Sequence, residues 1–228
     1  MNYFAHGRDF VDQPYVLAGT AVPDWLCVAD RAVRVRSKDA APLAADADDQ
    51  AAAVAAGIVR HCDDDRWFHA TRTFAELSLQ IAKMARAALP DDEGMRPSFL
   101  GHILVELLLD AALTEQDSAR LQAYYDALDE VDPAAVQATV NRIARRPTDR
   151  LALFIPIFRR ERFLWDYLDD GKLLARLNQV MCRVKLPALP AGFVDVLTAA
   201  RVLVRDRAGE LLIPSPAQCQ PTAIEELP

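Results

Sequence analysis

One segment of the chain is apolar enough to dictate how the rest of the protein is built. Residues 99–113 consist almost entirely of leucine, isoleucine, valine, alanine and phenylalanine, and Pro97 just before them is typical of a helix start. Such a helix must be buried on nearly every side. Its few polar residues, His102, Glu106 and Asp110, recur every four residues and therefore share one face. Burying that face is costly unless partners satisfy it, so these side chains need a structural or functional reason.

The remaining sequence indicates helices joined by proline-containing turns. A length of 228 residues with 52% hydrophobic residues supports one core, and 8 glycines beside 14 prolines favour an all-α fold. We expect two short helices before residue 30, the second beginning close to Asp24. An exposed strand or extended loop and then a surface connection should cover residues 31–49. Further helices are expected over residues 50–89 (one helix, or two in line, ended by the turn Pro90–Gly94), 117–128, 133–145, 148–169 and 172–184.

The last part of the sequence differs from the rest, and we expect it to form an extension. A proline-rich stretch at 187–190 leads to a short apolar helix. Residues 202–213 then alternate around a central Ala-Gly pair, a pattern typical of a β-hairpin, and beyond Pro214 we expect a loose tail. The predicted organisation is one helical domain over residues 1–186 and a C-terminal extension over residues 187–228.

The charge and the N-terminal sequence limit where the protein acts. A formal charge of −7 and a pI near 5.1 oppose contact with phosphate backbones, which excludes a general nucleic-acid binder. His6 and Asp9 interrupt the stretch that a signal peptide would need to be apolar. The longest apolar runs, such as residues 103–109, are interrupted by Glu106, and we expect none to be long enough to span a bilayer. These features predict a cytoplasmic protein without a membrane partner and leave its oligomeric state open.

The motifs of several common enzyme classes do not occur in the sequence. It has no glycine-rich phosphate loop, no serine elbow of the Gly-x-Ser-x-Gly type and no His-Glu-x-x-His zinc motif. The four cysteines, at positions 27, 62, 182 and 219, lack Cys-x-x-Cys spacing, so neither a zinc ribbon nor a disulfide framework is indicated. Metal-assisted hydrolysis remains among the common chemistries.

A second stripe of histidines and a carboxylate matches the first. His61, Asp65 and His69 are spaced four residues apart and share one face of a helix. Helical bundles build metal sites from imidazoles and carboxylates on facing helices, and mixed nitrogen and oxygen ligation suits manganese, iron or zinc better than calcium. An internal polar network without a metal is the alternative. If a metal is bound, His6 and Asp24 are candidates to complete its ligand sphere.

Three motifs near the N-terminus belong together. The chain opens Met-Asn-Tyr-Phe-Ala-His6, Asp24 follows after Gly19 and a short apolar stretch, and then comes Gly57-Ile-x-x-His61-x-x-x-Asp65. Together they resemble the acyl carrier protein phosphodiesterase family, and weaker matches extend to about residue 185. The resemblance implies an all-helical fold related to the HD-type phosphohydrolases. It also implies a manganese ion used to release phosphopantetheine from a serine of a carrier protein.

The chain departs from that family at two positions, as a divergent member would. Gly101 replaces the acid that precedes the matching His102, and His69 stands where the family has a second Asp. We expect His69 to act as a metal ligand, with Glu106 or Asp64 supplying the missing carboxylate.

The leading hypothesis is a metal-dependent phosphodiester hydrolase. The cation, manganese by resemblance with iron and zinc as alternatives, would activate a water molecule whose proton passes to Asp24 or Asp64. Seven arginines against two acids over residues 142–162 offer a basic surface to an acidic carrier protein, with Arg159 and Arg160 as phosphate ligands. The predicted metal ligands are His6, Asp24, His61, Asp65, His69, His102 and Glu106.

Two other hypotheses stay open. A non-catalytic helical scaffold could retain the pocket for binding a ligand or a partner protein, which the missing acid at position 101 favours. In that case the arginines would pair with the acidic residues 1–114, whose formal charge is −6. A zinc-dependent phospholipase-like enzyme would share the helices and the His/Asp ligands, but proteins of that kind are normally exported.

Overall fold

The computed structural model describes residues 1–45, 49–89 and 96–214, and every regular element in these ranges is a helix. The predicted all-α fold is confirmed. The elements, with η marking short 3-10 helices, are α1 (Tyr3–Gly7), η1 (Arg8–Phe10), α2 (Pro14–Ala29), α3 (Ser37–Ala44), α4 (Asp49–His69), α5 (Arg72–Ala88), α6 (Pro97–Gln116), α7 (Ser118–Asp129), α8 (Pro133–Ile143), α9 (Leu151–Glu161), η2 (Phe163–Leu168), α10 (Asp170–Arg183), η3 (Ala191–Phe193), α11 (Val194–Asp206) and α12 (Ala208–Leu211).

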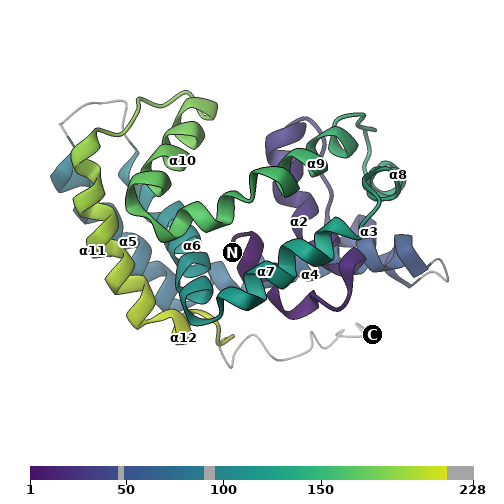
Figure 1. Cartoon of the computed structure of the whole chain (residues 1–228), viewed down its shortest axis with the longest axis horizontal. Coiled ribbons are helices and arrows are strands. Elements are labelled where there is room, and N and C mark those ends of the chain that lie inside the picture. Colours follow the sequence, from purple (N-terminus) through teal and green to yellow (C-terminus); the bar gives the residue numbers. More distant parts are fainter. Residues whose placement is uncertain (46–48, 90–95, 215–228) are drawn as a thin grey trace, which may run out of the picture.

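Helix α6 is the central helix of the core, as its composition predicted. Its leucines at positions 100, 104, 107, 108, 109 and 113 are all buried. Helices α1, α5, α11 and η2 pack against it. In Figure 1 the short α1 lies near the middle of the molecule, with α5, α6, α10 and α11 to one side and α2, α3, α8 and α9 to the other. The N-terminal segment is therefore positioned to contact both halves of the fold.

The expectation that no segment is long enough to span a bilayer is wrong for α6. By length and composition this 20-residue helix could cross a membrane. Within the protein, however, 67% of its most apolar window is buried. Its apolar surface is thus occupied by neighbouring helices, as in the central helix of a helical core.

Side-chain caps explain why several helices begin where the sequence predicted. Asp117, Asp132 and Asp169 each accept a hydrogen bond from a backbone N–H in the first turn of α7, α8 and α10. Thr71 does the same for α5, so the helical stretch expected over residues 50–89 divides into α4 and α5 at this corner. Each cap satisfies a donor that the helix itself leaves without a partner.

Proline positions misled the prediction for the N-terminal region. One helix, α2, runs from Pro14 to Ala29, and Pro23 lies inside it instead of starting a second helix at Asp24. The proline removes one backbone hydrogen bond. The helix continues because Trp25 and other apolar residues on both sides of the proline are fully buried: Leu17, Ala18, Ala21, Val22 and Leu26.

Two segments predicted as non-helical are helices. Residues 31–36 form the expected turn and extended stretch, but α3 follows and packs against α4. The expected β-hairpin over residues 202–213 is wrong, because α11 and α12 occupy this part of the chain. Apolar residues there recur every three or four positions and are buried: Val196, Leu197, Ala200, Val204, Ala208 and Leu211. This is helical spacing, and it places the expected extension, up to Pro214, in the same core as the rest of the chain.

The helix expected over residues 148–169 is interrupted. Arg162 has a left-handed backbone conformation, with φ 45°, and separates α9 from η2. The turn predicted at Pro90–Gly94 and the tail predicted beyond Pro214 lie outside the described residues, apart from Pro214 itself.

Glycines allow two helix pairs to approach each other more closely than any side chain permits. Where α2 crosses α4, a Cβ atom on Gly57 would lie 2.1 Å from the carbonyl oxygen of Val16 and 2.7 Å from the Cα of Gly19. Where α6 crosses α5, a Cβ on Gly101 would lie 2.1 Å from the carbonyl oxygen of Ser78. An acid at position 101 is therefore sterically excluded in this protein.

Replacing Gly57 should damage the fold severely. We expect Gly57→Ala to lower the free energy of unfolding by about 3 kcal/mol or more, because the clash is with backbone atoms that cannot rotate away. Gly209→Ala is the matched control, since a Cβ there meets nothing within 4 Å and alanine favours the helix. Urea denaturation of both variants gives the comparison, and equal midpoints for Gly57→Ala and the wild type would contradict the close crossing.

Candidate metal centre

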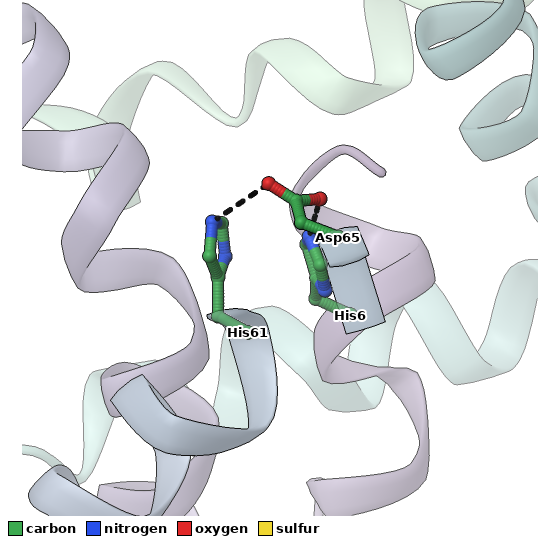
Figure 2. Close-up of side chains that lie close together, drawn as sticks. All are labelled: His6, His61 and Asp65. Atoms are coloured by element: carbon green, nitrogen blue, oxygen red, sulfur yellow. Dashed lines mark ion pairs between the residues drawn. The ribbon is translucent and has the colours of Figure 1, made fainter. Parts of the chain in front are cut away.

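Three of the predicted ligands converge in a buried group, which we call the first cluster: His6 from α1, and His61 and Asp65 from α4. Their ligand atoms all lie within 4.8 Å of one another. The carboxylate of Asp65 is 3.2 Å from His6 Nε2 through Oδ1 and 3.5 Å from His61 Nε2 through Oδ2. Figure 2 shows the carboxylate bridging the edges of the two imidazoles, which stack with centroids 4.1 Å apart.

Hydrogen bonds at the other ring nitrogens fix the state of both imidazoles. His61 Nδ1 is 2.8 Å from the carbonyl oxygen of Thr20, which can only accept, so Nδ1 carries the proton. His6 Nδ1 faces the carboxylate of Asp64 at 3.4 Å, while its buried Nε2 faces the carboxylate of Asp65, at 3.2 Å. Both Nε2 atoms thus face the Asp65 carboxylate. This contact is satisfied either by protons on Nε2, which hydrogen-bond to Asp65, or by a cation bound among the three groups.

The electrostatics of the first cluster follow from this crowding. Burial raises the pKa of Asp65, but hydrogen bonds to His6 and His61 and the charge of the Met1 ammonium outweigh it, so the pKa falls well below its usual range. Burial lowers the pKa of His61, yet the hydrogen bond to Asp65 and the charge of Asp24 raise it overall. Asp65 is therefore an anion at any ordinary pH.

Asp64 is fully engaged as a positioning residue. It is buried, pairs with Arg60 at 2.8 Å and accepts a hydrogen bond from Trp67 Nε1 in addition to its contact with His6. Burial raises the pKa of Asp64, but the hydrogen bonds to His6 and Arg60 lower it by more, so the net change is downward. A carboxylate held in this way orients the His6 imidazole and is a poor proton acceptor.

Three more of the predicted ligands form a separate group, the second cluster: His69, at the end of α4, with His102 and Glu106 from α6. Both histidine Nε2 atoms approach the same oxygen, Glu106 Oε1, at 2.7 and 3.2 Å. Burial raises the pKa of Glu106, but the hydrogen bonds to His102 and His69 lower it to about 2. The two stripes of the sequence therefore do not form one site each. His61 and Asp65 join His6, whereas His69 of the same stripe joins His102 and Glu106.

The Met1 ammonium lies between the two clusters. Its nitrogen is 2.6 Å from Asp65 Oδ1 and 3.6 Å from Glu106 Oε1. Burial lowers its pKa, and the charges of Glu106 and Asp65 raise it overall. A positive charge is therefore already stabilised where the two clusters adjoin.

Asp110, the last member of the α6 stripe, has a structural role. Its buried carboxylate accepts hydrogen bonds from Asn2 Nδ2 and from the backbone N–H groups of Phe4 and Ala5, at 2.8, 3.0 and 2.8 Å. Burial raises its pKa to about 7 against the lowering effect of these donors. These bonds attach α1, and with it His6, to α6.

An apolar pocket of about 430 Å³ adjoins the clusters. Two of its lining residues are the carboxylates Asp24 and Glu106, and Arg31 and Arg183 are among its cations. Among the described residues, no carboxylate lies within ion-pairing distance of Arg183, which belongs to the last turn of α10. Most of the lining is apolar and comes from α2, α6, α9, η2 and α10, for example Val28, Phe99, Ile103, Phe154, Ile157 and Val180.

Asp24 connects this pocket to the first cluster. Burial raises its pKa, the nearby imidazoles of His61 and His6 lower it, and the carboxylates of Glu106 and Asp65 raise it, with a net increase. Asp24 belongs to neither group of convergent ligands. A carboxylate with a raised pKa beside a pocket is suited to accept a proton from a reacting water.

The arginines predicted to bind phosphate lie elsewhere. Arg159 donates to the carbonyl oxygen of Val131, exposed Arg160 pairs with Glu161, and neither arginine lines the pocket. Arg31 and Arg183 do line it, although neither was predicted as a phosphate ligand. Their spacing in the sequence carries no signal, because the two residues are 152 positions apart and only the tertiary fold brings them together: Arg31 Nη1 donates to the carbonyl oxygen of Arg183 at 3.1 Å.

Comparison with known proteins adds no family to this geometry. No family model matches the chain, and no curated protein and no solved structure matches it either. The resemblance to acyl carrier protein phosphodiesterases rests on the short motifs, and the function has to be argued from the residues themselves.

The low pKa of Glu106 predicts an acid-dependent contribution to stability. A glutamate whose pKa falls from 4.5 unfolded to about 2 folded stabilises the protein fully above the unfolded value, and this is lost as the pH drops toward 2. For metal-free protein, the difference in unfolding free energy between wild type and Glu106→Gln should shrink by about 2 kcal/mol from pH 5 to pH 2.5. Urea unfolding at several pH values measures this, and a constant difference would contradict the ion pairs.

Proposed function

We propose that the protein is a metal-dependent phosphodiester hydrolase. The observation that carries this proposal is the first cluster, in which two imidazoles, each oriented by a contact at Nδ1, turn their Nε2 atoms toward one ionised carboxylate. This arrangement lies beside Asp24 and an apolar pocket with arginines in its lining.

The residues of the first cluster fit a divalent transition metal. Two imidazole nitrogens and one carboxylate oxygen suit manganese, iron or zinc, and the buried His6 Nε2 lacks any other partner. Thr20 and Asp64 hold the opposite ring nitrogens, as outer partners of metal-binding histidines commonly do. When bound, the cation supplies Lewis-acid activation of water and neutralises charge on a phosphoryl group.

The other residues divide the remaining tasks. Asp24 takes the proton of the attacking water, since its pKa is raised, it lines the pocket and its charge interacts with His61 and His6 of the cluster. Arg183 and Arg31 bind phosphate oxygens through charge-assisted hydrogen bonds. Asp64 keeps the His6 ring in place.

The pocket lining favours a phosphodiester with an apolar arm. Its aliphatic and aromatic walls would hold the arm, and the arginines would hold the charged group next to it. A phosphopantetheinylated carrier protein, the substrate that the motif resemblance suggests, has this combination of an arm and a phosphodiester. Arg183 is exposed and could also contact the acidic surface of such a partner.

The direct test is hydrolysis by protein that has been stripped with a chelator and reloaded with manganese. We expect turnover of bis(4-nitrophenyl) phosphate and of a phosphopantetheinylated carrier protein after reloading only. His61→Ala should abolish both the activity and one equivalent of bound metal. Protein that binds manganese but hydrolyses neither compound would favour the alternative function, a non-catalytic scaffold that uses the pocket for binding.

The role of Asp24 can be separated from that of a metal ligand. Asp24→Asn should lower kcat about 100-fold or more because the proton acceptor is lost, while the manganese stoichiometry stays unchanged. Asp12→Asn, an exposed carboxylate remote from the pocket lining, is the matched control and should behave as wild type. Loss of a metal equivalent in Asp24→Asn would show instead that Asp24 is a ligand.

A further inference from the structure

The ligand atoms of the second cluster are nearly as far apart as the ligands of a metal ion. Metal–ligand bonds of about 2.0–2.2 Å place neighbouring ligand atoms of a tetrahedral site about 3.3–3.6 Å apart. The Nε2 atoms of His69 and His102 lie 2.7 and 3.2 Å from Glu106 Oε1, and all three ligand atoms lie within 4.8 Å of one another. Small side-chain rotations would open these distances to the tetrahedral values, and the fourth position would remain for water or substrate.

Neighbouring aromatic rings hold the two imidazoles in this orientation. The ring of Phe74 lies 4.8 Å from that of His69 and 4.9 Å from that of His102, and Phe68 lies 5.5 Å from His69. Thr71 fixes the corner between α4 and α5 by donating to the carbonyl oxygen of Phe68 and accepting from the N–H of Phe74. The site is therefore built before a metal arrives, which reduces the cost of ordering its ligands.

Its electrostatic setting favours a cation. His69 is the last residue of α4, where the backbone carbonyl groups at the end of the helix carry partial negative charge. The side chain of His102 is 48% exposed, so an ion can enter directly from solvent. The first cluster differs in this respect, because its two imidazoles are almost completely buried.

We infer that His69, His102 and Glu106 form a second divalent-cation site that takes a borderline metal such as Zn²⁺ and shares no ligand with the first cluster. Glu106 also lines the apolar pocket, so the second cation would add positive charge at the same cavity. The site goes beyond the proposed hydrolase function, since it needs only the α4–α6 contact and makes no use of His6, His61 or Asp65.

Metal titration of the full-length, metal-free protein tests this site without an activity assay. Zn²⁺ binding is followed by calorimetry, and Co²⁺ binding by the visible absorption of four-coordinate cobalt. His102→Gln should remove one Zn²⁺ equivalent, or weaken it roughly 100-fold or more, and remove part of the cobalt absorption. This variant should fold, because the side chain is half exposed. Asp63→Asn, an exposed carboxylate on α4 paired with Arg66, is the control and should keep the full stoichiometry.

The outcomes separate this site from the proposed function. Unchanged stoichiometry in both His102→Gln and His69→Gln would overturn the second site. Loss of an equivalent in these variants, with none lost in His61→Ala, would support the second site and refute the role proposed for the first cluster. Loss of a different equivalent in each class of variant would support both.

Discussion

The carboxylate of Asp110 is the contact on which the candidate centre depends. Helix α1 has only five residues, too few to be stable by itself, and its first N–H groups have no intrahelical acceptors. Asp110 accepts two of these N–H groups and the Asn2 amide from within the buried core. Through them the central helix determines where His6 and the Met1 ammonium lie. The residue of the α6 stripe that belongs to neither cluster is thus the one that positions His6 for the first cluster.

The ligand residue types were predictable from the sequence, but their grouping was not. His61 and His69 are separated by eight residues, which in an α-helix leaves them about 80° apart around the axis. That rotation turns His61 toward α1 and α2 and His69 toward α6. Spacing of i, i+4 and i+8 therefore describes a stripe that winds around the helix, and its two ends meet different neighbours. The sequence cannot show which neighbours these are.

The same distinction applies to the fold. Helices with an acidic cap and an apolar repeat, such as α7 and α8, were predictable because their signals are local. Pro23 within α2 and the segment of α11 and α12 were mispredicted, since burial against distant helices overrode local signals for a break and a turn. The basic stretch over residues 142–162 predicted a high local positive charge but not where each arginine side chain points. Arg159 donates to the carbonyl oxygen of Val131 and does not line the pocket.

The glycine crossing of α2 and α4 has a chemical consequence as well as a mechanical one. Gly57 lies one turn before His61, and Gly19 directly precedes Thr20, whose carbonyl oxygen accepts a hydrogen bond from His61 Nδ1. The separation of the two helix axes therefore selects the tautomer of an imidazole. A motif of glycine followed four residues later by histidine can thus encode which ring nitrogen is available as a ligand. In this protein the absence of a side chain at Gly57 helps to determine which nitrogen of the His61 imidazole carries a proton.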